Sequence, residues 1–317
     1  MDRFTFFGGK GGVGKTTVSS AYAHKCARSD LETLLVSTDP AHSTADVFDQ
    51  RFDDDPTPVE GYDSLSVMEI DPEEAVDEHL MSIRRALGDQ VSPAIVNEID
   101  RQIELAHRTP GAHEAALFDR FIEVMRDADD YDRVVFDTSP TGGTLRLLSL
   151  PEYLGGWIDR LLDKREESVK LFERAAIGGR EPRRSEVGDP IIARLRQRKE
   201  NFEFAGERLR NDASFFLVLN PDQLSVRETG RAIEGLRDQD LSVSGLVVNR
   251  LTPEPDPDED GRGARYLRDR VETERERLRE ARESLAPPVV ATIESRVREV
   301  KGSLLESVAD ELGMSVD

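Results

Sequence analysis

The stretch FFGGKGGVGKTTVSS, from Phe6 to Ser20, decides the fold of this chain. It contains the pattern G-x-x-x-x-G-K-[ST], in which Gly9, Gly14, Lys15 and Thr16 occupy the fixed positions. Glycines let the backbone turn so that its N–H groups face phosphate oxygens, and the helix that follows adds a partial positive charge. The stretch therefore predicts a phosphate-binding loop between a strand and a helix.

The segments on either side of this loop have the order that the prediction requires. Arg3–Gly8 is an apolar run typical of a buried strand, and Lys15–Arg28 has the composition of a helix. In that context we expect Lys15 to reach the β- and γ-phosphates of a nucleotide and the Thr16 hydroxyl to ligate Mg²⁺. Lys10 is a second lysine in the same loop, and the pattern itself does not require it.

Further apolar runs alternate with helical patterns along the chain, which is typical of a mainly parallel sheet covered by helices. Several runs are apolar almost throughout, as strands buried on both faces should be. We therefore predict an α/β fold of the P-loop NTPase type, with further strands at Thr33–Thr38, Ser64–Ile70, Arg133–Thr138, Ser214–Asn220, Ser244–Arg250 and Pro288–Thr292.

Two long stretches interrupt this alternation with helical patterns alone. One runs from Asp71 to Asp130 and the other from Leu145 to Asp212, and one predicted strand separates them. We expect residues 72–130 and 145–212 to pack together as a helical subdomain inserted into a single ATPase domain that spans residues 1–317.

The amino-acid composition restricts the kinds of molecule that this chain can bind and the place where it works. The formal net charge is −21 over 317 residues, and such an acidic surface disfavours binding to a nucleic-acid backbone. We find no apolar run long enough for a membrane-spanning helix and no pattern of a secretory signal, so we expect a cytoplasmic protein. The single cysteine, Cys26, excludes an internal disulfide and a multi-cysteine zinc site within one chain.

Two aspartates at the ends of predicted strands are candidates for the chemistry. Asp137 ends the apolar run RVVFD, and we expect it to hold a water on Mg²⁺ from the second coordination shell. Asp39 follows another strand, at the edge where α/β sheets bind ligands. Hydrolysis needs a group that positions and polarises water, and Asp39 is our candidate for that role.

Three motifs in this order resemble the family of arsenical pump-driving ATPases and of ATPases that target tail-anchored membrane proteins. They are GGKGGVGKTT, DPAHS and DTSPTGGTLRLLSLP, which begin at Gly8, Asp39 and Asp137. The resemblance continues through VMEIDP, TPG, VVN and REVKG, so it covers nearly the whole chain.

The resemblance implies a homodimer that assembles in response to nucleotide. Lys10 would be the signature lysine that crosses the interface to the partner's nucleotide, Asp39 the hydrolytic aspartate, and Asp137 the start of a switch segment. Asn249 would read the adenine edge. The loop residues implied in binding ATP are Gly9, Gly11, Gly12, Val13, Gly14, Lys15, Thr16 and Thr17.

The sequence also departs from the family pattern. Targeting members often carry a C-x-x-C pair that joins two subunits through zinc, whereas this chain has TPEPDPDEDGRG at Thr252–Gly263, so we expect no zinc. Arsenite-responsive members bind the metalloid through several cysteines, which Cys26 alone cannot provide.

Three downstream roles remain open at this stage. The first is the delivery of tail-anchored or other hydrophobic membrane-protein clients to an insertase. The second is energy coupling for an exporter of arsenite or another anion, and the third is spatial positioning or partition. The acidic C-terminus disfavours the third, because a membrane anchor of that class is basic and amphipathic. Leucines and Trp157 at helical spacing within Leu147–Leu162 either line a client groove or pack inside the subdomain.

Acidity combined with 7 lysines and 36 arginines is typical of proteins from salt-accumulating microbes. We therefore predict that the melting temperature rises between dilute buffer and about 2 M KCl, because the Debye length falls below about 3 Å and self-repulsion is screened. Thermal unfolding followed by circular dichroism measures it. Loss of the fold in molar KCl, with full stability in dilute buffer, would exclude this adaptation.

Overall fold

The computed structural model describes residues 2–38, 43–71, 74–75, 81, 112–138 and 190–316. Within these ranges, strands form one sheet whose members are β1 (Phe4–Gly9), β2 (Thr33–Ser37), β3 (Thr57–Pro58), β4 (Leu65–Glu69), β5 (Arg133–Asp137), β6 (Ala213–Leu219), β7 (Val243–Leu251) and β8 (Val289–Glu294). Their order across the sheet is β3-β4-β2-β5-β1-β6-β7-β8. Only β3 runs antiparallel to its neighbour in this sheet, which confirms the predicted α/β architecture.

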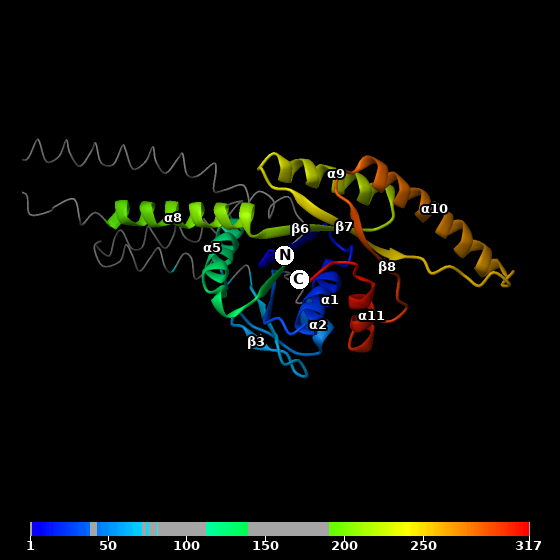
Figure 1. Ribbon diagram of the computed structural model, residues 1–317, viewed down its shortest axis with the longest axis horizontal. Helices are drawn as coiled ribbons and strands as arrows, with labels where there is room; N and C mark the ends of the chain where they lie inside the picture. The colour runs from blue at the N-terminus through cyan, green and yellow to red at the C-terminus, as the bar shows by residue number, and fades with distance from the viewer. Residues whose placement is uncertain are drawn as a thin grey trace, which may run out of the picture.

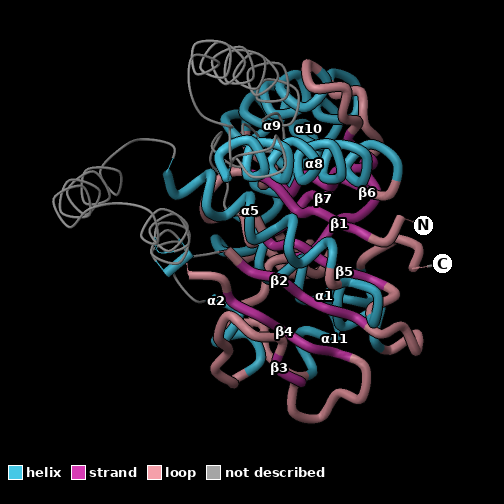
Figure 2. The backbone as a smooth tube through the Cα atoms, turned by 90° about the vertical axis from the view of Figure 1, so that its left-hand side faces the viewer, coloured by secondary structure: helices cyan, strands magenta, loops and turns pink. Residues whose placement is uncertain are grey.

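Helices cover both faces of the sheet (Figure 1). The described helices are α1 (Lys15–Ala27), α2 (Ser43–Phe48), α5 (Ala112–Arg126), η1 (Ala128–Asp130), α8 (Pro190–Asn211), α9 (Gln223–Arg237), α10 (Arg262–Ser284) and α11 (Ser303–Glu311). One apolar core joins α1, α2 and α11 to the sheet, and α5, α8, α9 and α10 pack against the opposite face (Figure 2). Two buried faces explain why the central strands are apolar at successive positions.

The centre of the sheet is held by aromatic side chains from three adjacent strands. Phe6 lies opposite Phe136 on β5 and Phe215 on β6. The ring centroids are 4.5 Å and 5.1 Å from that of Phe6, and the rings are stacked. The next residue, Phe7, points to the other face of the sheet. The centroid of its ring lies 5.5 Å from that of Tyr22 on α1. The strand that carries the phosphate loop is therefore packed on both sides.

Helices α5 and α8 belong to the two stretches in which we predicted a helical subdomain. The rings of Phe118 and Phe202 stack at 5.7 Å, and Arg198 pairs with Asp119 at 3.1 Å. Both helices also contribute to the core against the sheet. Most of residues 72–130 and 145–212, including the apolar segment Leu147–Leu162, lies outside the described residues, so the subdomain stays a prediction.

The C-terminal residues are hydrogen-bonded to both α1 and β5. Lys25 donates to the Leu312 carbonyl, Tyr22 donates to the Ser315 carbonyl at 3.5 Å, and Arg133 donates to the Val316 carbonyl at 2.9 Å. Helix α11 packs along α1 in the same region. The helix that begins at the phosphate loop is thus buried between the sheet and the end of the chain.

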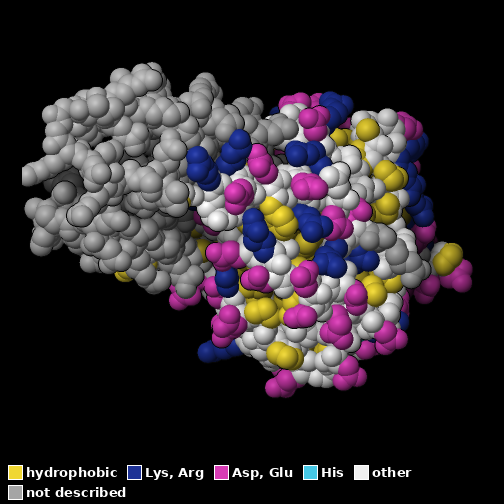
Figure 3. Space-filling model, turned by 60° about the vertical axis from the view of Figure 1, so that its left-hand side comes forward, with side chains coloured by type: hydrophobic (Ala, Val, Ile, Leu, Met, Phe, Trp, Pro, Cys, Tyr) yellow, Lys and Arg dark blue, Asp and Glu magenta, His cyan; other side chains and the backbone are white. Residues whose placement is uncertain are grey.

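Charges of both signs are interspersed on the described surface (Figure 3). Many of the ion pairs use arginine, whose planar guanidinium can make two hydrogen bonds at once. Arg120 pairs with the Asp54 carboxylate at 2.9 Å and also donates to the Asp54 carbonyl at 2.8 Å. Arginine at such positions offsets part of the acidic self-repulsion.

Candidate active site

The phosphate loop lies at the carboxyl end of β1, where the chain leaves the sheet and enters α1. Gly9, Gly12 and Gly14 have φ angles of 145°, 80° and 89°. Side chains of L-amino acids rarely tolerate these backbone conformations, whereas glycine adopts them without a steric penalty. Three glycines of the quoted stretch therefore stand where the loop needs them.

Two of these glycines lie too close to neighbouring atoms for any side chain. A Cβ on Gly9 would come within 2.3 Å of the Val218 carbonyl oxygen on β6, and a Cβ on Gly14 would come within 2.3 Å of Asn249 Nδ2 on β7. The loop is therefore held directly against the ends of these two strands. A loop without side chains at these points fits a phosphate group, which is bound by backbone N–H groups.

Asn249 braces the loop from β7. Its Nδ2 donates to the Val13 carbonyl at 2.8 Å, and its Oδ1 accepts from the Arg250 backbone N–H at 2.9 Å. Arg250 has a φ of 62°, an unfavourable value for arginine that the second hydrogen bond helps to hold. This role was not expected from the sequence, and the predicted contact of Asn249 with an adenine edge stays a prediction.

The two lysines of the loop lie in different surroundings. Lys15 begins α1 and is 8% exposed, and its Nζ lies 3.4 Å from the Lys10 carbonyl oxygen, to which it donates. Its ammonium is thus folded back over the loop, as expected of the lysine that serves phosphates in the same subunit. The Lys10 side chain is 41% exposed and points elsewhere, toward α9.

Asp137 lies beside the loop, at the end of the neighbouring strand. It is paired in register with Phe7 on β1 and with Ser37 on β2, and it is 1% exposed. Thr38 donates to the Asp137 carbonyl from its N–H at 3.2 Å and from its hydroxyl at 3.4 Å. Thr138 donates in the same manner to the Phe7 carbonyl, at 3.3 Å and 2.9 Å. These hydrogen bonds therefore link the carboxyl ends of β1, β2 and β5 to one another.

The remaining predicted site residues are placed less completely. Thr16 and Thr17 are in the first turn of α1, beside Lys15. Gly11 and Val13 lie in the loop itself, and Val13 is buried. Asp39 falls outside the described residues, one position after Thr38 at the end of β2. The described segments thus bring Asp137 and the loop together and leave the place of Asp39 untested.

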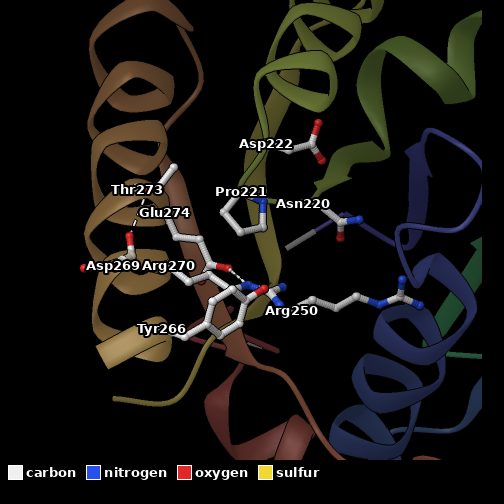
Figure 4. Close-up of a pocket in the computed structure, with 9 residues that line it drawn as sticks. All are labelled: Asn220, Pro221, Asp222, Arg250, Tyr266, Asp269, Arg270, Thr273 and Glu274. Atoms are coloured by element: carbon white, nitrogen blue, oxygen red, sulfur yellow. Dashed lines mark hydrogen bonds and ion pairs between the residues drawn. The ribbon is translucent and has the colours of Figure 1, made fainter. Parts of the chain in front are cut away.

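A hollow of about 580 Å³ lies between the β6–α9 turn, Arg250 near the end of β7, and α10 (Figure 4). Charged groups of both signs line it together with one aromatic ring, and the residues are Asn220, Pro221, Asp222, Arg250, Tyr266, Asp269, Arg270, Thr273 and Glu274. Sequence reasoning did not find this hollow, because its walls come from three separate parts of the chain.

The acidic segment Thr252–Gly263 is tied to α10. Buried Glu274 accepts from the Thr252 N–H at 2.6 Å, from the Thr252 hydroxyl at 2.8 Å and from Arg270 at 2.8 Å. Arg268 donates to the Asp256 carbonyl at 3.0 Å and to the Pro257 carbonyl at 3.1 Å. The segment is therefore held within its own subunit by side chains of α10.

Two features are absent from the described ranges. No group of three or more His, Cys, Asp or Glu side chains in these ranges is placed to hold a metal ion. Among the helices described, none has both the length and the apolar character needed to cross a membrane.

Comparison with known proteins gives consistent matches. The chain is 33% identical over 279 residues to the putative arsenical pump-driving ATPase 2 of Aquifex aeolicus, and the match covers 88% of each chain. It is 35% identical over 261 residues to the ATPase ASNA1 homolog of Dictyostelium discoideum, over 80% of this chain and 74% of that relative. It is 34% identical over 302 residues to a putative arsenical pump-driving ATPase of Halobacterium salinarum, over 92% of this chain and 42% of that relative.

A family model described as anion-transporting ATPase matches residues 2–313. This range includes the phosphate loop, the sheet and the strand ends around Asp137 and Asn249. The chain therefore belongs to the anion-transporting ATPase family.

Proposed function

We propose that this ATPase is a dimeric molecular switch, which couples binding and hydrolysis of ATP to the handling of hydrophobic membrane-protein clients. The observation that carries the proposal is the contrast between the two lysines of one loop. Lys15 is buried over the loop, and Lys10 is half exposed on its outer side. A lysine turned out of its own loop suits the site of a second subunit, since ionised phosphates need more than one cation.

The loop fits the triphosphate of ATP on steric and electrostatic grounds. Gly9 and Gly14 leave no room for side chains, and the N-terminus of α1 adds a partial positive charge. Lys15 would neutralise the transferred phosphoryl group from the same subunit. Thr16 would ligate Mg²⁺ and Asp137 would act from the second coordination shell, and the ion would supply further charge neutralisation when bound.

Hydrolysis requires a water aligned with the γ-phosphate, and we assign its positioning to Asp39. The segment that carries Asp39 starts at Thr38, which is hydrogen-bonded to the Asp137 carbonyl next to the loop. This anchor would bring a carboxylate near the phosphates. Loss of phosphate would then release the segments after Thr38 and Thr138 and move the rest of the subunit.

Client delivery is our preferred downstream role. ATPase ASNA1 homologs and GET3-type ATPases are among the relatives. The thiol chemistry of this chain disfavours metalloid sensing. Cys26 is fully buried, and burial raises the pKa of its thiol to about 11, so it offers no thiolate to arsenite at neutral pH.

The second candidate is energy coupling to an exporter of arsenite or another anion. The Aquifex aeolicus and Halobacterium salinarum relatives are named as putative arsenical pump-driving ATPases, which favours it. Such a role would need a membrane partner that recognises the nucleotide state of this chain. It would also need a ligand whose binding does not use Cys26.

We predict that Asp39→Asn lowers ATP turnover by at least about 100-fold while leaving ATP affinity within a few-fold, because the amide cannot polarise the attacking water as a carboxylate does. Phosphate release and equilibrium nucleotide binding measure the two effects. Asp46→Asn, an exposed change on α2, is the matched control and should be silent. Full turnover of Asp39→Asn would exclude the assigned role.

The same variant separates the two downstream roles. Held with ATP, Asp39→Asn should retain a bound hydrophobic segment, because the ATP state persists. We expect a tail-anchored test protein to co-purify with it and to dissociate when ATP is removed. Arsenite-stimulated turnover of the unmodified chain, with no retained test protein, would instead support the exporter role.

A mixing experiment tests whether Lys10 acts in the neighbouring subunit. Lys10→Ala and Lys15→Ala should each be nearly inactive alone. In a mixed dimer, the Lys10→Ala subunit keeps its own Lys15 and receives Lys10 from its partner. We therefore predict recovery of about a quarter of native turnover per subunit, because half of randomly paired dimers have one complete site.

No recovery on mixing would contradict an action of Lys10 across subunits. Full activity of Lys10→Ala alone would contradict any catalytic role of this lysine. Analytical ultracentrifugation of the mixture with ATP should establish in parallel that dimers have formed.

A further inference from the structure

Lys10 has a charge partner inside its own subunit. Its Nζ lies 3.4 Å from Oε2 of Glu228, although the two residues come from distant parts of the sequence. Lys10 stands at the start of the phosphate loop, and Glu228 is in the second turn of α9. The outward direction of Lys10 is therefore set by a contact and is not merely a consequence of exposure.

The helix that carries Glu228 is firmly mounted. Asp222 caps its N-terminus by accepting from the Ser225 N–H at 2.8 Å, and the Ser225 hydroxyl accepts from the Asn220 N–H at 3.0 Å. Val226 is buried in an apolar cluster with strands β6 and β7. Because β6 also pairs with β1, Glu228 occupies a fixed position relative to the loop.

The carboxylate and the ammonium differ in their exposure to water. Oε2 of Glu228 is shielded from solvent, although 35% of the side chain is exposed. Lys10 can reach bulk solvent, with 41% of its side chain exposed. Within the described part of the chain, this shielded oxygen pairs with the Lys10 ammonium. Withdrawing Lys10 would leave a shielded anion without its cation, which is unfavourable.

We propose that Glu228 is a positioning residue that holds Lys10 within its own subunit. It does so until the nucleotide of a partner subunit takes the place of Glu228 beside the Lys10 ammonium. The inference rests on the proposed function, in which Lys10 serves the phosphates of the second subunit. Contact with a phosphate of the second subunit would draw the Lys10 ammonium away from Glu228, so the carboxylate and the phosphate would compete for it. Only subunits whose Lys10 has left Glu228 are competent to pair. The apparent affinity between subunits is therefore reduced in proportion to the fraction of subunits in that state.

Glu228→Gln tests this competition, because the amide keeps the size of the side chain and removes the negative charge. We expect the protein concentration at half-maximal ATP turnover to fall about two- to fivefold, a range set by the modest strength of a partly exposed ion pair. The dependence of that concentration on salt should also weaken. Glu228→Asp keeps the charge and should restore near-native behaviour.

Glu234→Gln is the matched control, since it removes one carboxylate from the exposed face of the same helix. It should leave the concentration dependence unchanged, and it corrects for any effect of net charge. The proposal is overturned if ATP turnover depends on protein concentration in Glu228→Gln as it does in the native chain. It is also overturned if Glu234→Gln shifts this dependence by the same amount as Glu228→Gln. Circular dichroism and nucleotide binding establish that each variant is folded.

A double-variant cycle with Lys10→Ala distinguishes failure of this inference from failure of the proposed function. If Glu228 acts through Lys10, Glu228→Gln has no effect on the concentration dependence of residual turnover once Lys10 is absent. A persistent effect would overturn the inference and leave the role of Lys10 intact. If Lys10→Ala itself has native turnover, the proposed function fails instead.

Discussion

The hydrogen bond from the Asn249 amide to the Val13 carbonyl is the constraint on which the rest of the site depends. It joins the end of β7 to the middle of the phosphate loop, with a distance of 2.8 Å between Nδ2 and the carbonyl oxygen. The absence of a side chain on Gly14 makes the approach possible, because a Cβ there would collide with the same amide. On the other side of the loop, Gly9 lies against the Val218 carbonyl of β6. The loop is therefore fixed by contacts with two strands of its own chain, which reduces the cost of ordering it.

The two lysines of this loop point in different directions. Lys15 starts α1 and folds back over the loop, and Lys10 leaves the loop on the side of α9. Under the proposed function, the first serves the phosphates of its own subunit and the second those of the partner. The acidic segment after β7 is tied to α10 of the same chain by Glu274 and Arg268. Pairing of subunits would then depend on nucleotide and on the release of Lys10.

The sequence predicts the parts of this molecule that depend on local pattern. Strands such as Phe4–Gly9 and Arg133–Asp137 are mostly apolar because both of their faces are buried, and their boundaries lie within about two residues of the predicted ones. The strand Thr57–Pro58 was not predicted, because two residues that include a proline have no recognisable period.

Contacts between distant segments could not be predicted in the same manner. The brace from Asn249 and the ion pair of Lys10 with Glu228 both depend on the order β1-β6-β7, which sets which helix and which strand end lie beside the loop. That order also connects the two segments that would act as switches. Thr38 is bonded to the carbonyl of Asp137, and Thr138 is bonded to the carbonyl of Phe7, the residue two positions before Gly9. Under the proposed function, a displacement at the end of β2 would therefore reach the end of β5 and the start of the loop through these hydrogen bonds.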